Sequence, residues 1–124
     1  MSEAAVKTQK RLALVIDDDA EMRELIAVLL ESRGFEVEML ADGIHATELS
    51  KEYDVIVLDM KMPVFDGARL TDYWMLTAPQ VMRRVIVLSA YVRSRVPHPP
   101  AFGVMSKPFN HNEFIKLVEE CANQ

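Results

Sequence analysis

The chain has 124 residues, which suits one domain, and half of them are hydrophobic while about a quarter are charged. The formal net charge of −5 argues against direct binding of nucleic acid or of anionic membranes, because both depend on positive charge. No apolar run approaches the ~20 residues of a membrane span. The single cysteine, Cys121, excludes an internal disulfide and suggests a reducing compartment, so we expect a cytoplasmic protein.

The first third of the chain predicts a tail, a buried strand and a helix. Residues 1–10 are polar and are expected to form a flexible tail ahead of a single domain, residues 11–124. The apolar run Leu12 to Ile16 is typical of a strand that is buried on both faces. The next helix is predicted to have Asp19 as its N-cap and Gly34 at its C′ position. Its apolar residues recur at helical spacing: Met22, Leu25, Ile26, Leu29 and Leu30.

The middle of the chain predicts two more strands and two more helices. Phe35 to Leu40 alternates between apolar and polar residues, which indicates an outer strand with one wetter face. Ile44 to Lys51 is predicted to be a short helix, and Val55 to Leu58 is predicted to be a second buried strand. A helix from about Gly67 to Leu76 ends before Pro79, and we expect its inner face to include a mostly buried tryptophan. That face is predicted to consist of Leu70, Trp74 and Thr77.

The last third predicts two strands and a helix, with one weak place between them. Val85 to Ser89 and Gly103 to Ser106 are the strands, and Asn110 to Ala122 is a helix that opens with capping-box-like spacing. Its apolar stripe is predicted to be Phe114, Leu117 and Val118. Between Tyr91 and Phe102 the run VPHPP holds three prolines within four positions, so a helix there is predicted to be absent or reduced to about one turn.

Strands and helices alternate along the chain, which predicts an open parallel sheet with helices on both faces and right-handed crossovers. In such sheets the functional site lies outside the carboxyl ends of the strands. Alone, an acid, a hydroxyl or an amine at a strand end is more often a helix cap, a turn residue or a solvated charge. Here four strand ends would meet at one edge of the sheet and bring together Asp17, Asp18, Asp59, Ser89 and Lys107.

Three carboxylates at one edge repel one another, and the pKa of at least one of them would rise unless a cation intervened. Lys107 offsets only one negative charge, so a divalent metal is expected. Magnesium fits, because it takes oxygen ligands, keeps several waters and binds through one or two carboxylates together with phosphate. A zinc site is disfavoured, because the three histidines occur in loop or helix contexts: His45, His98 and His111.

This group of residues predicts phosphoryl transfer, which needs positioning and charge neutralisation. Asp59, at the end of a buried strand, would attack an incoming phosphoryl group to give an aspartyl phosphate. Magnesium would bridge a carboxylate and one phosphoryl oxygen. Lys107 would neutralise a second oxygen, and the hydroxyl of Ser89 would donate to a third.

Four motifs, in order and at fitting distances, resemble the receiver domain of bacterial two-component response regulators: VIDDDAEMRE, VIVLDMKMPVFDG, VIVLSA and SKPF. The resemblance extends from about Leu12 to Ala122. It implies a flavodoxin-like, doubly wound, five-stranded parallel sheet with strand order 2-1-3-4-5. It also implies a phosphoacceptor that is fed by a sensor histidine kinase or a histidine phosphotransfer protein and that signals to a downstream protein. Such a domain would catalyse only its own phosphorylation and dephosphorylation and would not be an enzyme.

The resemblance also implies how the metal is held. Asp18 would be a direct magnesium ligand, while Asp17 would act mostly through metal-bound water. The phosphoacceptor Asp59 and the backbone carbonyl of Lys61 would complete the site. Asp19, third in the acidic run, is better explained as the helix cap.

On the phosphate side, the resemblance makes Ser89 the switch hydroxyl, and Ala90 leaves room for the phosphoryl group. Lys107 would pair with the phosphate, and a cis peptide bond is expected before Pro108. Two departures from the family pattern stand out. Val104 occupies a position where the family often has Tyr or Phe, and the segment before it is shorter than usual. We therefore expect an atypical output face.

Three other classes of protein fit this sequence less well. A magnesium-dependent phosphohydrolase of the haloacid-dehalogenase kind would need an acid two residues after the nucleophile, where this chain has Lys61. A phosphorylation-independent interaction module would be expected to lack either Asp59 or Lys107, and both are present. A flavodoxin-like cofactor binder is disfavoured further, because no Gly-rich phosphate loop follows the first strand.

Overall fold

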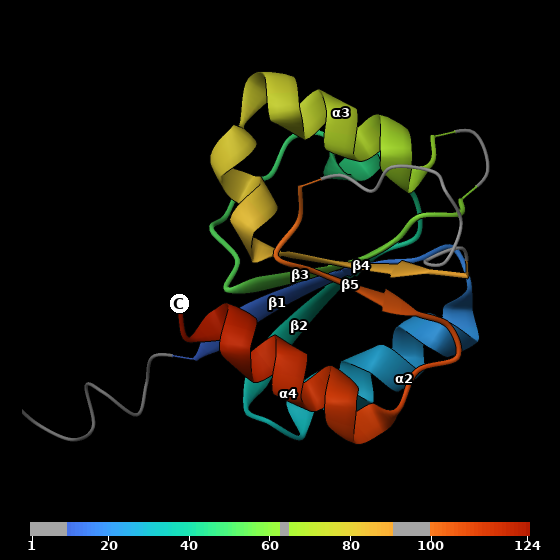
Figure 1. Ribbon diagram of the computed structural model, residues 1–124. Helices are drawn as coiled ribbons and strands as arrows, with labels where there is room; N and C mark the ends of the chain where they lie inside the picture. Colours follow the sequence, from blue (N-terminus) through green and yellow to red (C-terminus); the bar gives the residue numbers. More distant parts are fainter. Residues whose placement is uncertain (1–9, 63–64, 91–99) are drawn as a thin grey trace, which may run out of the picture.

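The computed structural model describes residues 10–62, 65–90 and 100–124, which form a five-stranded sheet with helices on both faces (Figure 1). The strand order is β2-β1-β3-β4-β5, and every neighbouring pair is parallel. The strands are β1 (Arg11–Ile16), β2 (Phe35–Leu40), β3 (Val55–Asp59), β4 (Val85–Ser89) and β5 (Gly103–Ser106). The order and the direction of the strands confirm the predicted flavodoxin-like sheet.

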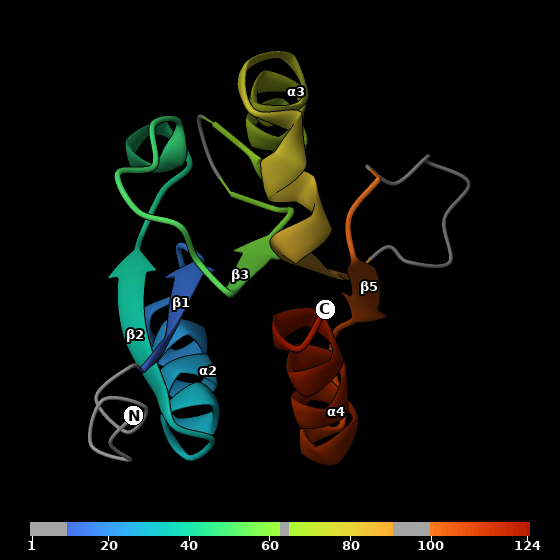
Figure 2. The same cartoon turned by 90° about the vertical axis from the view of Figure 1, so that its left-hand side faces the viewer.

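Two layers of helices enclose the sheet. Helices α2 (Ala20–Glu31) and α4 (His111–Ala122) lie side by side on one face (Figure 2). Helix α3 (Gly67–Thr77) and the 3₁₀ helices η1 (Ile44–Ala46) and η2 (Pro79–Arg84) lie on the other. Each layer therefore buries its own hydrophobic core against the sheet.

The alternation of side chains along the strands divides the core. In β1, Val15 packs with Ile26 and Phe114 on the α2–α4 side, while its neighbour Leu14 packs with Trp74 on the α3 side. All residues of β3 and β4 are buried, as expected for strands that are covered on both faces. The edge strand β2 is only partly covered, which confirms that it is an outer strand.

Helix α2 begins as predicted. The side chain of Asp19 accepts hydrogen bonds from the backbone N–H groups of Glu21 and Met22, which fixes the first turn. At the other end the C-cap is Ser32, so Gly34 lies one position beyond its predicted C′ position, but it has the expected left-handed conformation with φ of 87°. Of the apolar residues at helical spacing, Ile26 and Leu30 are fully buried, whereas Leu25 is 36% exposed.

Helix α3 begins after its N-cap Asp66, whose side chain accepts from the N–H of Arg69. Trp74 is buried as predicted, and its indole N–H donates to the carbonyl of Ala46 at 3.1 Å. The prediction that Thr77 shares the inner face is wrong, since Thr77 is exposed. The buried face is instead Gly67, Leu70, Thr71 and Trp74.

The short helix predicted for Ile44 to Lys51 is also wrong, because only Ile44–Ala46 forms a 3₁₀ turn. An α-helix would need the carbonyl of Ala46 to accept from the N–H four residues later. That carbonyl accepts the indole N–H of Trp74 at 3.1 Å. A tertiary contact thus ties the end of the 3₁₀ turn to helix α3.

The remaining elements agree with the sequence where they are described. Helix α4 starts after Asn110, whose side chain accepts from the N–H of Glu113 at 3.0 Å, and the Lys107–Pro108 peptide bond is cis. Within the described residues, no helix is long and apolar enough to cross a membrane. The predicted tail falls largely on residues 1–9, and the predicted loss of a helix between Tyr91 and Phe102 falls mostly on residues 91–99. Both of these segments lie outside the described residues.

Gly67, the first residue of α3, packs directly against the end of β3, and this contact is testable. An added Cβ would lie 2.7 Å from the Cα of Met60 and 2.9 Å from the carbonyl oxygen of Asp59. We expect Gly67→Ala to lower the free energy of unfolding by about 1–3 kcal/mol, because backbone atoms must move to make room. Urea unfolding followed by circular dichroism measures the loss.

Gly103→Ala is the matched control. Its Cβ would meet only the side chain of Leu117, at 3.0–3.4 Å, and that side chain can move. The control should therefore lose clearly less stability, and equal losses in the two variants would contradict the proposed packing constraint.

Candidate functional site

The carboxyl edge of the sheet brings the predicted strand-end residues together. Asp17 directly follows β1, Asp59 is the last residue of β3, and Ser89 is the last residue of β4. The N–H of Lys107, just after β5, donates to the carbonyl of Ser89 at 3.0 Å. Carboxylate oxygens of Asp17, Asp18 and Asp59 all lie within 4.8 Å of one another. Parallel strands in this order thus gather residues that are up to 90 positions apart in the chain.

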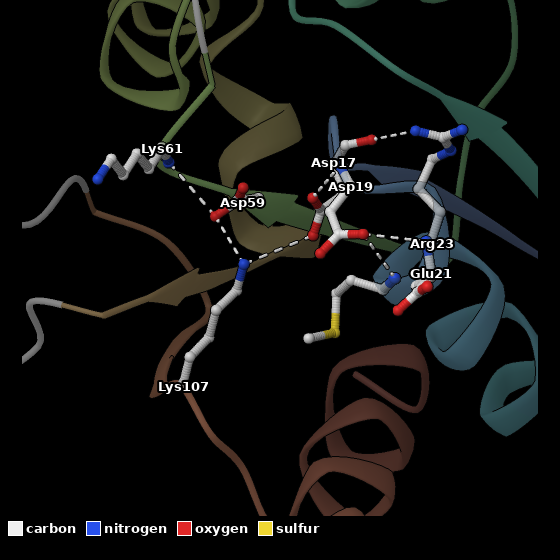
Figure 3. Close-up of polar contacts among 8 residues, drawn as sticks. Asp17, Asp19, Glu21, Arg23, Asp59, Lys61 and Lys107 are labelled. Atoms are coloured by element: carbon white, nitrogen blue, oxygen red, sulfur yellow. Dashed lines mark hydrogen bonds and ion pairs between the residues drawn. The ribbon is translucent and has the colours of Figure 1, made fainter.

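Asp59 is held from two directions (Figure 3). The ammonium of Lys107 donates to its Oδ1 at 3.0 Å, and the backbone N–H of Lys61 approaches the same oxygen at 3.3 Å. The side chain of Asp59 is only 6% exposed. Its carboxylate is therefore fixed in position at the edge of the sheet and lies against a cation.

Asp17 has a different environment from the other carboxylates. It is 1% exposed, and its Oδ1 accepts the N–H of Asp19 at 2.9 Å. Its Oδ2 has no hydrogen-bond donor among the described residues and lies 3.6 Å from the ammonium of Lys107. Burial, and after it the nearby charge of Asp59, raises the pKa of Asp17 to about 6. A buried acid with one oxygen left without a donor fits a site that takes a cation.

Lys107 is the cationic side of the site. Burial alone would lower the pKa of its ammonium, but the hydrogen bond to Asp59 and the charges of Asp17 and Asp59 outweigh burial, and the pKa is raised. The ammonium therefore stays charged and contacts both carboxylates. It offsets only one of the three negative charges in the cluster.

The donor set fits magnesium. The cluster offers carboxylate oxygens and, among the described residues, includes no histidine or cysteine. Hard oxygen ligands on a partly open edge, with space for waters, are the ligands that magnesium takes in proteins. The exposed Asp18 gives the cluster its access to solvent.

Sequence reasoning missed two features of this site. Asp19 was interpreted only as a helix cap, yet its backbone N–H also orients the carboxylate of Asp17. Arg23 was not singled out, yet its guanidinium donates to the backbone carbonyl of Asp17 at 2.8 Å. The available signal was the spacing, because a residue four positions after an N-cap lies one turn above it on the helix.

A cavity of about 370 Å³ lies elsewhere, at the amino ends of the strands. It is bordered by Asp54, just before β3, by Arg84, just before β4, and by Trp74 of α3. The acidic cluster does not contribute to its lining. The chemistry predicted from the sequence therefore belongs to the opposite edge of the sheet.

The fold and the site together define a class: a parallel α/β domain with a buried acid, two neighbouring acids and a lysine at the carboxyl edge of its sheet. The family model of the response regulator receiver domain matches residues 13–119. The chain therefore belongs to the response regulator receiver domain family.

Individual relatives agree with this assignment. The chain is 32% identical over 117 residues to the CpxR homolog of Haemophilus influenzae, a transcriptional regulatory protein, with 86% of this chain and 48% of that protein covered. It is 30% identical over 119 residues to the sensor kinase CckA of Brucella abortus, covering 90% of this chain and 12% of the kinase. The chain thus spans about half, or less, of the length of these curated relatives.

Solved structures show the same fold. The receiver domain of the Francisella response regulator 1452 superposes with a TM-score of 0.79 at 29% identity, covering 91% of this chain and 97% of that one. The response regulator TrrA of Thermotoga maritima, solved in complex with Mg²⁺ and BeF, gives a TM-score of 0.78 at 27% identity, with 90% and 98% covered.

The environment of Asp17 makes stability depend on pH. Its pKa is raised from 3.8 to about 6, so the stability of the metal-free protein that comes from protonated Asp17 is complete below pH ~4 and is lost as the pH rises through about 6. We expect this loss to be on the order of 2 kcal/mol and to be absent in Asp17→Asn. Urea unfolding in EDTA at several pH values measures both proteins.

The difference between wild type and Asp17→Asn isolates this one group, because the other carboxylates titrate in both proteins. The variant should gain stability relative to wild type as the pH rises from about 4 to about 7. Parallel stability curves for the two proteins would contradict the raised pKa.

Proposed function

We propose that the chain is the phosphoacceptor of a two-component phosphorelay and that Asp59 accepts the phosphoryl group in a magnesium-dependent reaction. One observation carries the proposal. The carboxylate of Asp59 is held 3.0 Å from the ammonium of Lys107, at the end of a fully buried strand and beside two further carboxylates. A rigid nucleophile next to a fixed cation and a cluster of metal-binding oxygens is what phosphoryl transfer requires.

In the proposed reaction an oxygen of Asp59 forms a bond to phosphorus, while the bond between phosphorus and a histidine nitrogen of the donor protein breaks. The departing imidazole nitrogen takes up a proton, and Asp59 becomes a mixed anhydride. Hydrolysis by water later returns the carboxylate and releases inorganic phosphate. The domain thereby catalyses its own phosphorylation and dephosphorylation and turns over no external substrate.

Each neighbour of Asp59 has a role in the proposal. Asp18 would hold magnesium directly, Asp17 would support it through metal-bound water, and Lys61 would contribute its backbone carbonyl. When bound, the ion neutralises negative charge on the carboxylates and on the phosphoryl oxygens. Asp17 is buried, and its Oδ2 has no hydrogen-bond donor among the described residues, which supports a place for this carboxylate in the metal site.

Two side chains receive the phosphoryl oxygens. Lys107 exchanges its hydrogen bond to Asp59 for a phosphoryl oxygen, and the hydroxyl of Ser89 donates to another. Ser89 is 6% exposed and stands on the strand next to that of Asp59, which supports its role as the switch hydroxyl. Movement of Ser89 toward the phosphate would carry the signal out of the site.

The partners follow from the family. Receiver domains receive phosphate from histidine kinases or phosphotransfer proteins, and we propose such a donor for the domain of residues 11–124. We also propose that the domain works in the cytoplasm. The downstream target is a protein. The half-buried Val104 packs into the core on the α3 side, where the family often has an aromatic residue, which supports an atypical output face. A phosphohydrolase role is less favoured, because the residue two positions after Asp59 is the exposed Lys61 and not an acid.

The first test concerns the phosphoacceptor. Incubation with acetyl phosphate and magnesium should add one phosphoryl group to the wild type and none to Asp59→Asn, since an amide is a poor nucleophile. Intact-protein mass spectrometry measures the gain, and reductive trapping followed by peptide analysis locates it.

Asp72→Asn is the matched control, because Asp72 is exposed on α3, away from the strand ends. It should be phosphorylated like the wild type. Phosphate remaining on Asp59→Asn, or trapped on another residue of the wild type, would refute the assignment.

The second test separates phosphorylation from switching. We expect Lys107→Ala to keep some phosphorylation by acetyl phosphate but to lose the conformational response, because the phosphoryl oxygens lack their fixed cation. Amide chemical shifts recorded with and without beryllofluoride measure the response. Lys116→Ala, which removes an exposed lysine of α4 outside the site, is the control. A response of wild-type size beyond the immediate site in Lys107→Ala would contradict the role.

A further inference from the structure

We propose that Arg23 is a positioning residue for the metal site, which it serves by fixing the peptide unit between Asp17 and Asp18. Arg23 touches neither the reacting atoms nor the proposed ion. The inference rests on the proposed function, because it concerns how well the acidic cluster is prepared to bind magnesium.

Arg23 holds the turn between β1 and α2 at two points. Its guanidinium Nη1 donates to the carbonyl of Asp17 at 2.8 Å, and its backbone N–H donates to the carbonyl of Asp19 at 2.9 Å. Figure 3 shows the guanidinium lying on the far side of this turn from Asp59 and Lys107. The carbonyl of Asp17 is therefore directed away from the acidic cluster and toward helix α2.

The rest of Asp17 is fixed independently of Arg23. Its N–H donates to the carbonyl of Leu40 at the end of β2, at 3.1 Å, and its Oδ1 accepts the N–H of Asp19. Its backbone carbonyl accepts a hydrogen bond from the guanidinium of Arg23. Every backbone group of Asp17 thus has a partner, and the direction in which the chain enters Asp18 is determined.

The position of Asp18 depends more on the direction of the backbone than the positions of Asp17 and Asp59 do. Asp59 is held by Lys107 and by the N–H of Lys61, and Asp17 is held by the N–H of Asp19. Within the described residues, neither a hydrogen bond nor an ion pair holds the exposed side chain of Asp18, although its carboxylate lies within the 4.8 Å cluster. Its place in the cluster therefore depends on the backbone, and Arg23 is the side chain that fixes the preceding peptide unit.

Charge and positioning predict opposite effects on magnesium binding. Arg23 carries a positive charge, so removing that charge would strengthen the binding of a cation if electrostatics alone mattered. Removing the hydrogen bond frees the carbonyl of Asp17 and loosens Asp18, which would weaken binding. The sign of the change therefore distinguishes the two effects.

The test compares wild type, Arg23→Met and Arg23→Lys by calorimetric titration with magnesium. Methionine keeps an apolar stem without donors, and lysine keeps the charge and a donor. We expect magnesium to bind Arg23→Met about 10- to 150-fold more weakly, the range for losing a hydrogen bond made by a charged group. Arg23→Lys should recover at least half of the loss on a logarithmic scale.

Arg83→Met is the matched control, because Arg83 is an exposed arginine of η2 at the opposite edge of the sheet. It should bind magnesium within about twofold of wild type, since its charge lies beyond a Debye length of the site. Amide spectra of the metal-free proteins provide a second measurement. The Asp18 and Asp19 resonances should shift or broaden in Arg23→Met and stay unchanged in Arg83→Met.

The outcomes separate the two proposals. Absence of magnesium binding in the wild type would overturn the proposed function. Wild-type binding together with equal or tighter binding in Arg23→Met would overturn the positioning role, even if that variant has a lower melting temperature. Should Arg23→Met not fold, the same titration on Arg23→Leu, which also lacks a donor, decides, and affinity within twofold of wild type would again count against the role. Failure of Arg23→Lys to bind more tightly than the donor-free variant would also overturn it.

Discussion

Mutual repulsion among three carboxylates is the constraint on which the rest of this structure depends. Asp17, Asp18 and Asp59 place oxygens within 4.8 Å of one another, and Lys107 supplies a single positive charge against them. Burial, and after it the charge of Asp59, raises the pKa of Asp17, so part of the cost of repulsion appears in that pKa. A rigid backbone is needed to hold the three carboxylates this close together. A bound cation would then offset the negative charge that Lys107 leaves uncompensated. The two fully buried central strands supply that rigidity.

The same arrangement explains how the site can respond to phosphate. Lys107 bridges Asp59 and Asp17, so the contacts of its ammonium must change when a phosphoryl group arrives on Asp59. Lys107 also hydrogen-bonds through its backbone to the carbonyl of Ser89, which couples the ends of β4 and β5. A change at Asp59 would therefore have a direct physical route to the strand that carries Ser89, the proposed switch hydroxyl.

The curated relatives are longer than this chain. Matches include a transcriptional regulator and a sensor kinase, of which the alignment covers 48% and 12% respectively. The same receiver unit thus occurs with different neighbours. Val104, which departs from the family pattern, packs against the core on the α3 side, and the acidic cluster is present at the carboxyl edge.

The sequence by itself determined the sheet, its buried strands, the helix caps at Asp19 and Asn110 and the residues that gather at the strand ends, because these follow from local periodicity and from the rule that parallel strands share one carboxyl edge. Only the tertiary structure decided that the segment after Ile44 is a single 3₁₀ turn, which the indole of Trp74, 28 residues away from Ala46, ties to helix α3 through the carbonyl of Ala46. It also decided the exposure of Leu25 and Thr77 and the contact of Arg23 with Asp17. Such features depend on which groups meet across elements, and no local pattern along the chain records that.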